Sequence, residues 1–158
     1  MAENAAAKFY KWDKRDGYWV PENRNLYNSY FYAVEDPTNT VLDKLKLHGD
    51  RFTKNLDGGV AAHINLAEHL TKTQYRTLMD IAAKEGCSYF TYNVAATCCN
   101  NPDCGYVSKH TLDACPICGS TDVDYATRII GYLKKVSNFS EARQIEASKR
   151  FYDGGVKF

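Results

Sequence analysis

The chain has 158 residues, of which 44% are hydrophobic and 25% are charged. This balance is typical of one ordinary globular domain with room for a small satellite, and it excludes a disordered chain. A formal net charge of +1 excludes a globally basic nucleic-acid binder, and no apolar run in the sequence reaches the length of a membrane span.

The first 26 residues are polar and turn-rich, and the opening MAENAAA is expected to be a loose leader. They contain no apolar signal core, so the expected location is the cytoplasm. In that reducing compartment six cysteines favour metal or redox chemistry over disulfide bonds.

The stretch LYNSYFYAV, residues 26–34, has the composition of a strand. A short helix is expected to follow, because Thr40 and Asp43 have capping-box spacing and Gly49 is suited to end it. The next stretch, GGVAAHINL at residues 58–66, alternates with the two-residue period of a strand.

A second helix is expected over residues 71–86, where Thr71 and Gln74 form a capping box and Gly86 ends the pattern. Its predicted apolar face comprises Tyr75, Leu78, Met79 and Ala82. The strand-like CSYFTYNVA at residues 87–95 follows directly. Strand, helix and strand in this order, with short links, predict a βαβ unit with parallel strands.

Five of the six cysteines lie within residues 98–120. Two pairs, Cys99-x4-Cys104 and Cys115-x2-Cys118, are separated by ten residues. Two short cysteine hairpins at this distance can bring four thiolates to one tetrahedral Zn²⁺. An ion closed by four cysteines has no open coordination position, so the predicted zinc is structural rather than catalytic.

Cys98 is an alternative first ligand, but CNNPDCG resembles a common zinc-ribbon knuckle and favours Cys99. The other interpretations are two disulfides, which the cytosol disfavours, and an iron–sulfur cluster, for which no open or hydrophobic cradle is evident. His110, midway between the pairs, is expected to be a solvated loop residue. On the cysteines alone, a zinc-ribbon module that binds nucleic acid or another protein is an allowed function.

Residues 125–136, YATRIIGYLKKV, are expected to form a strand or an extended loop. Gly131 interrupts their apolar run, and a glycine at such a place normally weakens a strand. A final amphipathic helix, capped by Ser140, is expected over residues 140–152. Its predicted buried residues are Ala142, Ile145 and Ala147.

The four-cysteine ribbon followed by RIIGYL, residues 128–133, resembles the C-terminus of anaerobic (class III) ribonucleoside-triphosphate reductases. The glycyl-radical motif of that family has the form Arg-Val-x-Gly-Tyr-Leu. Further matching stretches are VPENRNLYNSYFYAVED, LDGGVAAHINL, EGCSYFTYNV, CGYVSKHTLDACPICGS and VSNFSEARQ. They cover the chain from about residue 10 to its end, and their order and spacing make the resemblance specific.

The resemblance implies an oxidoreductase that reduces ribonucleotides by radical chemistry, supplying deoxyribonucleotides for DNA replication under anaerobic conditions. It implies a glycyl radical on Gly131, formed when a partner activase with an iron–sulfur cluster and S-adenosylmethionine removes a hydrogen from the Cα. In the family the radical passes to an upstream cysteine, whose thiyl radical abstracts the 3′-hydrogen of the ribonucleotide. Cys87 is not assigned that role, because a buried and inert thiol is expected there. For Arg128 two interpretations stay open: a specific role in the radical site, or a solvated surface charge.

The fold class implied by the resemblance is α+β: the C-terminal segment of a ten-stranded α/β barrel with a small zinc ribbon and a glycyl radical loop. Residues 1–96 are expected to hold the last barrel strands and helices, residues 97–124 the ribbon, and residues 125–158 the radical loop and C-terminal helix. Zinc is expected to brace that loop, because the roughly thirty residues from Arg128 onward are too few to form a core.

Members of the family are several times longer, so this chain is expected not to reduce nucleotides by itself. An N-terminal reductase part or a full-length reductase is an expected partner, supplying the site for the ribonucleoside triphosphate. Three explanations stay open: one piece of a split reductase, a truncated fragment, or a spare glycyl radical carrier resembling those that repair oxygen-cleaved pyruvate formate-lyase. No membrane and no specific nucleic acid is expected as a partner.

Overall fold

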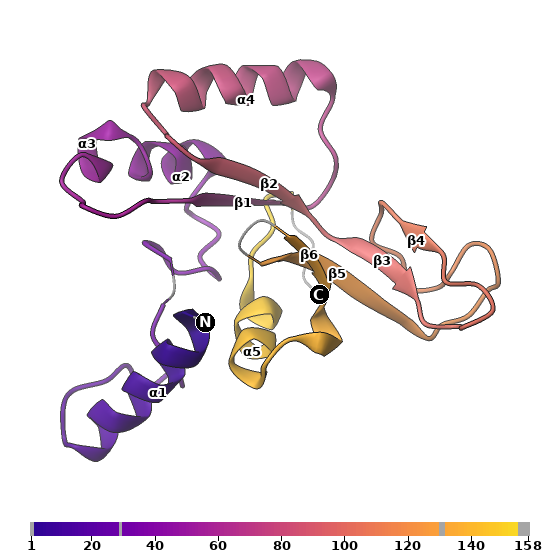
Figure 1. The fold of residues 1–158 in the computed structure, drawn as a ribbon, viewed down its shortest axis with the longest axis horizontal. Helices are drawn as coiled ribbons and strands as arrows, with labels where there is room; N and C mark the ends of the chain where they lie inside the picture. Colours follow the sequence, from indigo (N-terminus) through magenta and orange to yellow (C-terminus); the bar gives the residue numbers. More distant parts are fainter. Residues whose placement is uncertain (1, 29, 130–131, 155–158) are drawn as a thin grey trace.

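The computed structural model describes residues 2–28, 30–129 and 132–154 and has a mixed α/β fold (Figure 1). In chain order its elements are α1 (Ala2–Arg15), α2 (Val41–Leu47), α3 (Asp50–Thr53), β1 (Ala62–Leu66), α4 (Lys72–Lys84), β2 (Phe90–Val94), β3 (Ala96–Cys99), β4 (Val107–Ser108), β5 (Val123–Ile129), β6 (Tyr132–Lys135), the 3-10 helix η1 (Val136–Asn138) and α5 (Glu141–Lys149). Within this part of the chain, no helix combines the length and apolar character needed to cross a membrane.

The predicted βαβ unit is confirmed. β1 and β2 pair in parallel, from Ala62 opposite Phe90 to Leu66 opposite Val94, and α4 connects them (Figure 1). All five residues of β1 are buried, so this strand lies inside the molecule rather than at its surface.

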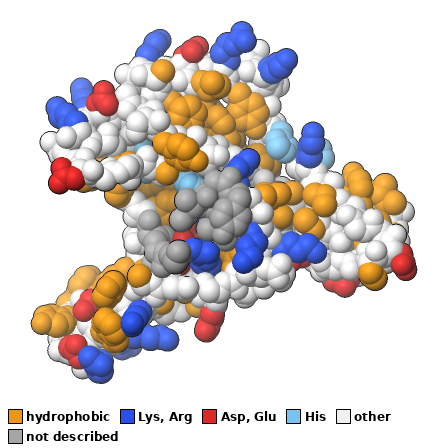
Figure 2. Space-filling model, in the orientation of Figure 1, with side chains coloured by type: hydrophobic (Ala, Val, Ile, Leu, Met, Phe, Trp, Pro, Cys, Tyr) orange, Lys and Arg blue, Asp and Glu red, His pale blue; other side chains and the backbone are white. Residues whose placement is uncertain are grey.

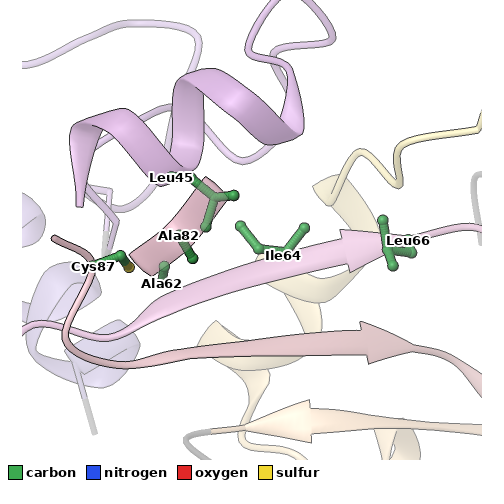
Figure 3. Close-up of a cluster of buried hydrophobic side chains, with 6 residues drawn as sticks. All are labelled: Leu45, Ala62, Ile64, Leu66, Ala82 and Cys87. Atoms are coloured by element: carbon green, nitrogen blue, oxygen red, sulfur yellow. The ribbon is translucent and has the colours of Figure 1, made fainter. Parts of the chain in front are cut away.

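The main hydrophobic core lies between β1 and the helices α2 and α4. Figure 3 shows its buried side chains in the space between these elements: Leu45, Ala62, Ile64, Leu66, Ala82 and Cys87. Their burial removes apolar surface from water, which is the main favourable term in folding. Because all five residues of β1 are buried, both faces of this strand pack against other parts of the molecule.

Both predicted capping boxes are present at the starts of α2 and α4. The hydroxyl of Thr40 accepts from the Asp43 N–H, and the Asp43 carboxylate accepts from the Thr40 N–H. Thr71 and Gln74 make the same reciprocal pair at α4. Gly86 follows α4 with φ +74°, a left-handed conformation that favours glycine at a helix end.

A second sheet has the strand order β4-β3-β5-β6, and all its neighbours are antiparallel. One residue, Ala95, separates β2 from β3, so the chain passes directly from the parallel pair into this sheet. The sheet extends away from the βαβ unit toward the cysteine-rich loops (Figure 1). The predicted strand over residues 125–136 is confirmed as β5 and β6 for its described residues.

The expectation of a loose N-terminal leader is wrong, because residues 2–15 form α1. The alanines there have high helix propensity, and the helix has a partner in α5. Arg143 Nε donates to Glu3 Oε2 at 2.9 Å. Ser140 stands at the N-cap of α5 as predicted, but its hydroxyl donates to Asn4 Oδ1 at 2.8 Å and makes no cap bond.

The expectation of a strand at residues 26–34 is also wrong, since none of the described residues there pairs in a sheet. Part of the segment is buried without pairing in a sheet: Leu26 and Val34 are buried, whereas Phe31 is exposed. Tyr32 is buried, and its hydroxyl donates to the carbonyl of His63 on β1 at 3.1 Å. The segment therefore covers β1 with side chains instead of extending the sheet.

The predicted apolar face of α4 is correct except at Met79, which is 54% exposed. Ile81 packs against the core instead. The buried stripe runs through Tyr75 and Ala82, and the exposed Met79 lies at its margin.

The last described residues close over β1. Asp153 forms a parallel bridge with Leu66, its N–H donates to the Asn65 carbonyl at 3.0 Å, and its carbonyl accepts from the Ala67 N–H at 2.9 Å. Lys44 Nζ, on the buried side of α2, lies 2.7 Å from Asp153 Oδ2. The segment that follows α5 is thus fastened to the βαβ unit.

Removing the Glu146 carboxylate is expected to destabilise the fold strongly. Glu146 and Arg150 form an ion pair at the end of α5, and both side chains are 3% exposed. Burial by itself lowers the pKa of Arg150, but the hydrogen-bonded Glu146 carboxylate more than offsets this, so the pKa is raised overall. Glu146→Ala leaves the guanidinium buried and unpaired, so the free energy of unfolding in urea is expected to fall by about 3–5 kcal/mol.

Glu141→Ala is the matched control on the exposed face of the same helix. It loses only a favourable interaction with the helix N-terminus, so a change below about 1 kcal/mol is expected. Equal losses in the two variants would contradict the special cost assigned to the buried pair.

Candidate metal centre and the Gly131 segment

The four cysteines predicted as ligands come together in space. The sulfurs of Cys99, Cys104, Cys115 and Cys118 all lie within 4.8 Å of one another. Two of the separations are 3.6 Å, between Cys99 and Cys118, and 3.7 Å, between Cys104 and Cys115. A tetrahedral ion with Zn–S bonds of about 2.3 Å requires sulfur separations of about 3.8 Å. The cluster therefore has the size and donor set that fit such an ion.

Two tight turns, one in each cysteine loop, bring the sulfurs together. Gly105 and Gly119 each follow a cysteine directly, with φ of +57° and +72°. In this left-handed region a side chain is strained, so both turns favour glycine. The Gly119 N–H donates to the Cys115 carbonyl at 2.9 Å, and the Gly105 N–H donates to the Asn101 carbonyl at the same distance.

Backbone N–H groups also point at the sulfurs. The N–H of Cys118, aided by that of Ile117, lowers the pKa of the Cys115 thiol to about 7, against the burial that raises it. Burial raises the pKa of Cys99 to about 12. Four adjacent thiolates repel one another, so a bound cation is needed to hold all four deprotonated.

The structure brings Cys99 rather than Cys98 into the cluster. Neighbouring residues of a strand point to opposite faces, so Cys98 is buried on the other side of β3. All six cysteines are free thiols in this structure. Cys87 is buried in the core as predicted, and burial raises its pKa. His110 is exposed, also as predicted.

Gly131 lies outside the described residues, together with residue 130. β5 ends at Ile129 and β6 begins at Tyr132, and these two residues are opposite each other in the antiparallel register. The strands before and after Gly131 are therefore neighbours in the sheet. Arg128 stands opposite Leu133 and is half-buried.

Sequence reasoning missed a buried polar cluster beneath β5. Its centre is Asn93 of β2, which is fully buried and stands opposite Asn65 of β1. Thr127 of β5 and Arg150 after α5 complete it. An asparagine near the end of each of the two predicted parallel strands was the available signal, since buried amides need polar partners.

Acidification is expected to destabilise the chain through His63. This side chain is buried on β1, and burial lowers its pKa below the ordinary value, with a further contribution from the charge of Arg150. The unfolded state therefore takes up the proton first. The stabilising contribution is complete above the unfolded pKa of about 6.5 and is lost as the pH falls through it.

Urea denaturation at several pH values between about 7.5 and 5 checks this prediction. His63→Gln should weaken the pH dependence, whereas His69→Gln, at an exposed position, should leave it unchanged. Because both variants keep the cysteine cluster, any acid release of metal is common to them. The same dependence in both variants would contradict the role of His63.

The chain is similar to known proteins of one kind over nearly all of its length. A family model described as anaerobic ribonucleoside-triphosphate reductase matches residues 2–152. A solved anaerobic ribonucleotide reductase is similar with 28% identity and a TM-score of 0.73, over 98% of this chain and 24% of its own. The enzyme from Thermotoga maritima in complex with dATP and CTP is similar with 28% identity and a TM-score of 0.71, over 92% of this chain and 23% of its own.

The same Thermotoga maritima enzyme with MES in its active site is 29% identical, with a TM-score of 0.70 over 88% of this chain and 22% of its own. The chain thus spans about a quarter of the length of these solved structures. The comparison with curated proteins found no match.

Proposed function

This chain belongs to the anaerobic ribonucleoside-triphosphate reductase family, and on that premise we propose that it is the part of such a reductase that carries the glycyl radical, on Gly131. The observation that carries the proposal is the family match over residues 2–152, which includes the strands on both sides of Gly131. The antiparallel pairing of β5 with β6 supports it, because the segments before and after the glycine are held side by side.

The four clustered cysteines are proposed to hold Zn²⁺. The ion would supply structural bracing and no catalytic chemistry, since four thiolates leave no open coordination position. Support comes from the sulfur separations and from the sheet, in which β3, ending at Cys99, pairs with β5. The proposed zinc site is therefore linked by hydrogen bonds to the strand that leads to Gly131.

The βαβ unit is proposed to belong to the ten-stranded barrel, with the remaining strands supplied by an N-terminal reductase part or a full-length reductase. The division into residues 1–96, 97–124 and 125–158 stays a prediction. Hydrophobic side chains gather on the surface around α1 (Figure 2), and four large aromatic residues there are between 41% and 85% exposed: Phe9, Trp12, Tyr18 and Trp19. Such exposed apolar surface supports contact with a partner chain.

The proposed activity follows from these assignments. An activase carrying an iron–sulfur cluster, with S-adenosylmethionine, removes a hydrogen atom from the Gly131 Cα, and the radical then passes to a cysteine of the N-terminal part. The completed enzyme reduces a ribonucleoside triphosphate to the deoxyribonucleotide. The Thermotoga maritima enzyme in complex with dATP and CTP supports nucleotide ligands of this class.

Electron paramagnetic resonance tests the proposal. The chain is incubated without oxygen with the activase and S-adenosylmethionine, and a doublet from one glycyl α-hydrogen is expected. The activase is first shown to be competent on a full-length anaerobic reductase. No doublet under these conditions would contradict the proposal, and tight nucleic-acid binding by the same chain would favour a zinc-ribbon binding module.

A further inference from the structure

The amide of Asn93 holds the backbone of β5 from beneath. Its Nδ2 donates to Asn65 Oδ1 and to Thr127 Oγ1, both at 2.8 Å. Its Oδ1 accepts from the backbone N–H of Arg128 at 2.9 Å. Because an N–H can only donate, this last contact identifies the amide atom that faces the Arg128 N–H as the oxygen. The side chain is 0% exposed and uses both of its ends.

Arg150 binds the other backbone group of Arg128, its carbonyl. Its Nη1 donates to Thr127 Oγ1 and to the backbone carbonyl of Arg128, both at 3.3 Å. The Glu146 carboxylate fixes the guanidinium through two further bonds, at 2.8 and 2.7 Å. The hydroxyl of Tyr152 lies 3.2 Å from Thr127 Oγ1. Both backbone groups of Arg128 are thus engaged by buried side chains.

These contacts begin where the pairing of β5 with β3 ends, on the edge of β5 that faces away from β6. β3 pairs with β5 only as far as Ala126, opposite Ala96. Beyond that point the part-buried N–H and C=O of Arg128 still need partners, and side chains of β2 and of the α5 segment provide them. Arg128 is three residues before Gly131 in the chain. The network therefore connects the approach to Gly131 with the βαβ unit.

We infer that Asn93, together with Arg150, is a positioning residue for the Gly131 radical. The inference rests on the proposed function and deepens it. Hydrogen-atom transfer needs donor and acceptor atoms in near contact, so a small displacement of the segment before Gly131 lowers the rate steeply. The network sets that position from the βαβ unit, at the end of β5 far from the cysteine cluster.

The test compares Asn93→Ala with Asn100→Ala, a matched control whose exposed amide lies in the ribbon. Hydrogen–deuterium exchange of residues 123–129 reports how firmly the backbone of β5 is held, and the electron-paramagnetic-resonance doublet per chain reports the radical. For Asn93→Ala, exchange about tenfold faster and a doublet reduced about tenfold are expected, because a buried amide hydrogen bond is lost. Metal content and exchange in α4 should match the wild type, as should every property of Asn100→Ala.

A second pair keeps the inference testable if Asn93→Ala does not fold. Thr127→Val preserves volume but removes the hydroxyl shared by Asn93 and Arg150, whereas Thr127→Ser keeps it. Thr127→Val should lower the doublet severalfold and Thr127→Ser should restore it.

The two proposals fail differently. A wild-type doublet that persists unchanged in Asn93→Ala and Thr127→Val, while β5 exchanges faster, overturns the positioning role and leaves the proposed function intact. A wild-type chain without a doublet overturns the proposed function and, with it, the positioning role. Unchanged exchange of β5 in both variants overturns the network as the support of that strand.

Discussion

Replacing Gly131 with alanine is expected to abolish the glycyl-radical signal completely. A radical on a backbone Cα is stabilised by the adjacent amide nitrogen and carbonyl only when the centre becomes planar. A Cβ hinders that planarity and blocks access to the hydrogen, and glycine alone lacks it. The measurement is the spin count of the doublet after anaerobic incubation with the activase and S-adenosylmethionine.

Gly59→Ala is the matched control. A Cβ at Gly59 meets no atom within 4 Å, and this residue does not have a left-handed φ, so the doublet should equal that of the wild type. Exposure to oxygen provides a second readout, because oxygen cuts the backbone at a glycyl radical. The activated wild type should be cleaved at residue 131, and Gly131→Ala should stay intact. A full doublet in Gly131→Ala would assign the radical to another residue.

The double substitution Cys115→Ser with Cys118→Ser is expected to release the metal and to abolish radical formation. Structural zinc sites contribute about 10–16 kcal/mol of binding free energy in small peptides, far more than a short ribbon gains from its own core. Loss of two thiolates should therefore unfold the ribbon loops while α4 stays folded. Elemental analysis is expected to show one zinc per wild-type chain and none in the variant.

Cys98→Ser separates the ligand assignment from a general effect of cysteine loss. Cys98 is buried beside the cluster but is not part of it, so this variant should keep its zinc and its doublet. Zinc retained in the double variant would contradict the assignment of Cys115 and Cys118 as ligands. A metal-free protein with normal radical yield would refute the bracing role.

The cysteine cluster and the Asn93 network hold opposite ends of one strand. β5 begins at Val123, opposite Cys99, and ends at Ile129, next to the peptide that Asn93 holds. Metal removal and Asn93→Ala should therefore weaken the same strand from different ends. Hydrogen exchange should distinguish the two, with the first loss of protection near Val123 in one case and near Arg128 in the other.

Features that depend on neighbouring residues could be predicted from the sequence. Thr40 and Asp43, like Thr71 and Gln74, contact each other across one helical turn, so their spacing alone indicates where the helices start. The cysteine pairs likewise form their turns locally, and the spacing of the two pairs indicated the cluster. The family resemblance was also carried by local motifs, in the order that the family match supports.

Other features depended on partners far along the chain and were decided only by the tertiary structure. α1 forms where a loose leader was expected, and it contacts α5 through Glu3 and Arg143, which are 140 residues apart. The aromatic segment at 26–34 packs over β1 instead of pairing as a strand. No local pattern specifies such partners, because burial depends on which surfaces meet after the chain has folded.

The side-chain amide of Asn93 shows most clearly what the sequence determined and what only the tertiary structure decided. By itself the sequence indicated the family through the resemblance of its motifs, and it indicated the four-cysteine cluster and the parallel βαβ unit through short-range spacing. That Asn93 holds the peptide of Arg128, 35 residues later, could not be derived in this way. The contact requires β2, β5 and the segment after α5 to converge, and a buried amide acquires its role only from the polar groups brought beside it.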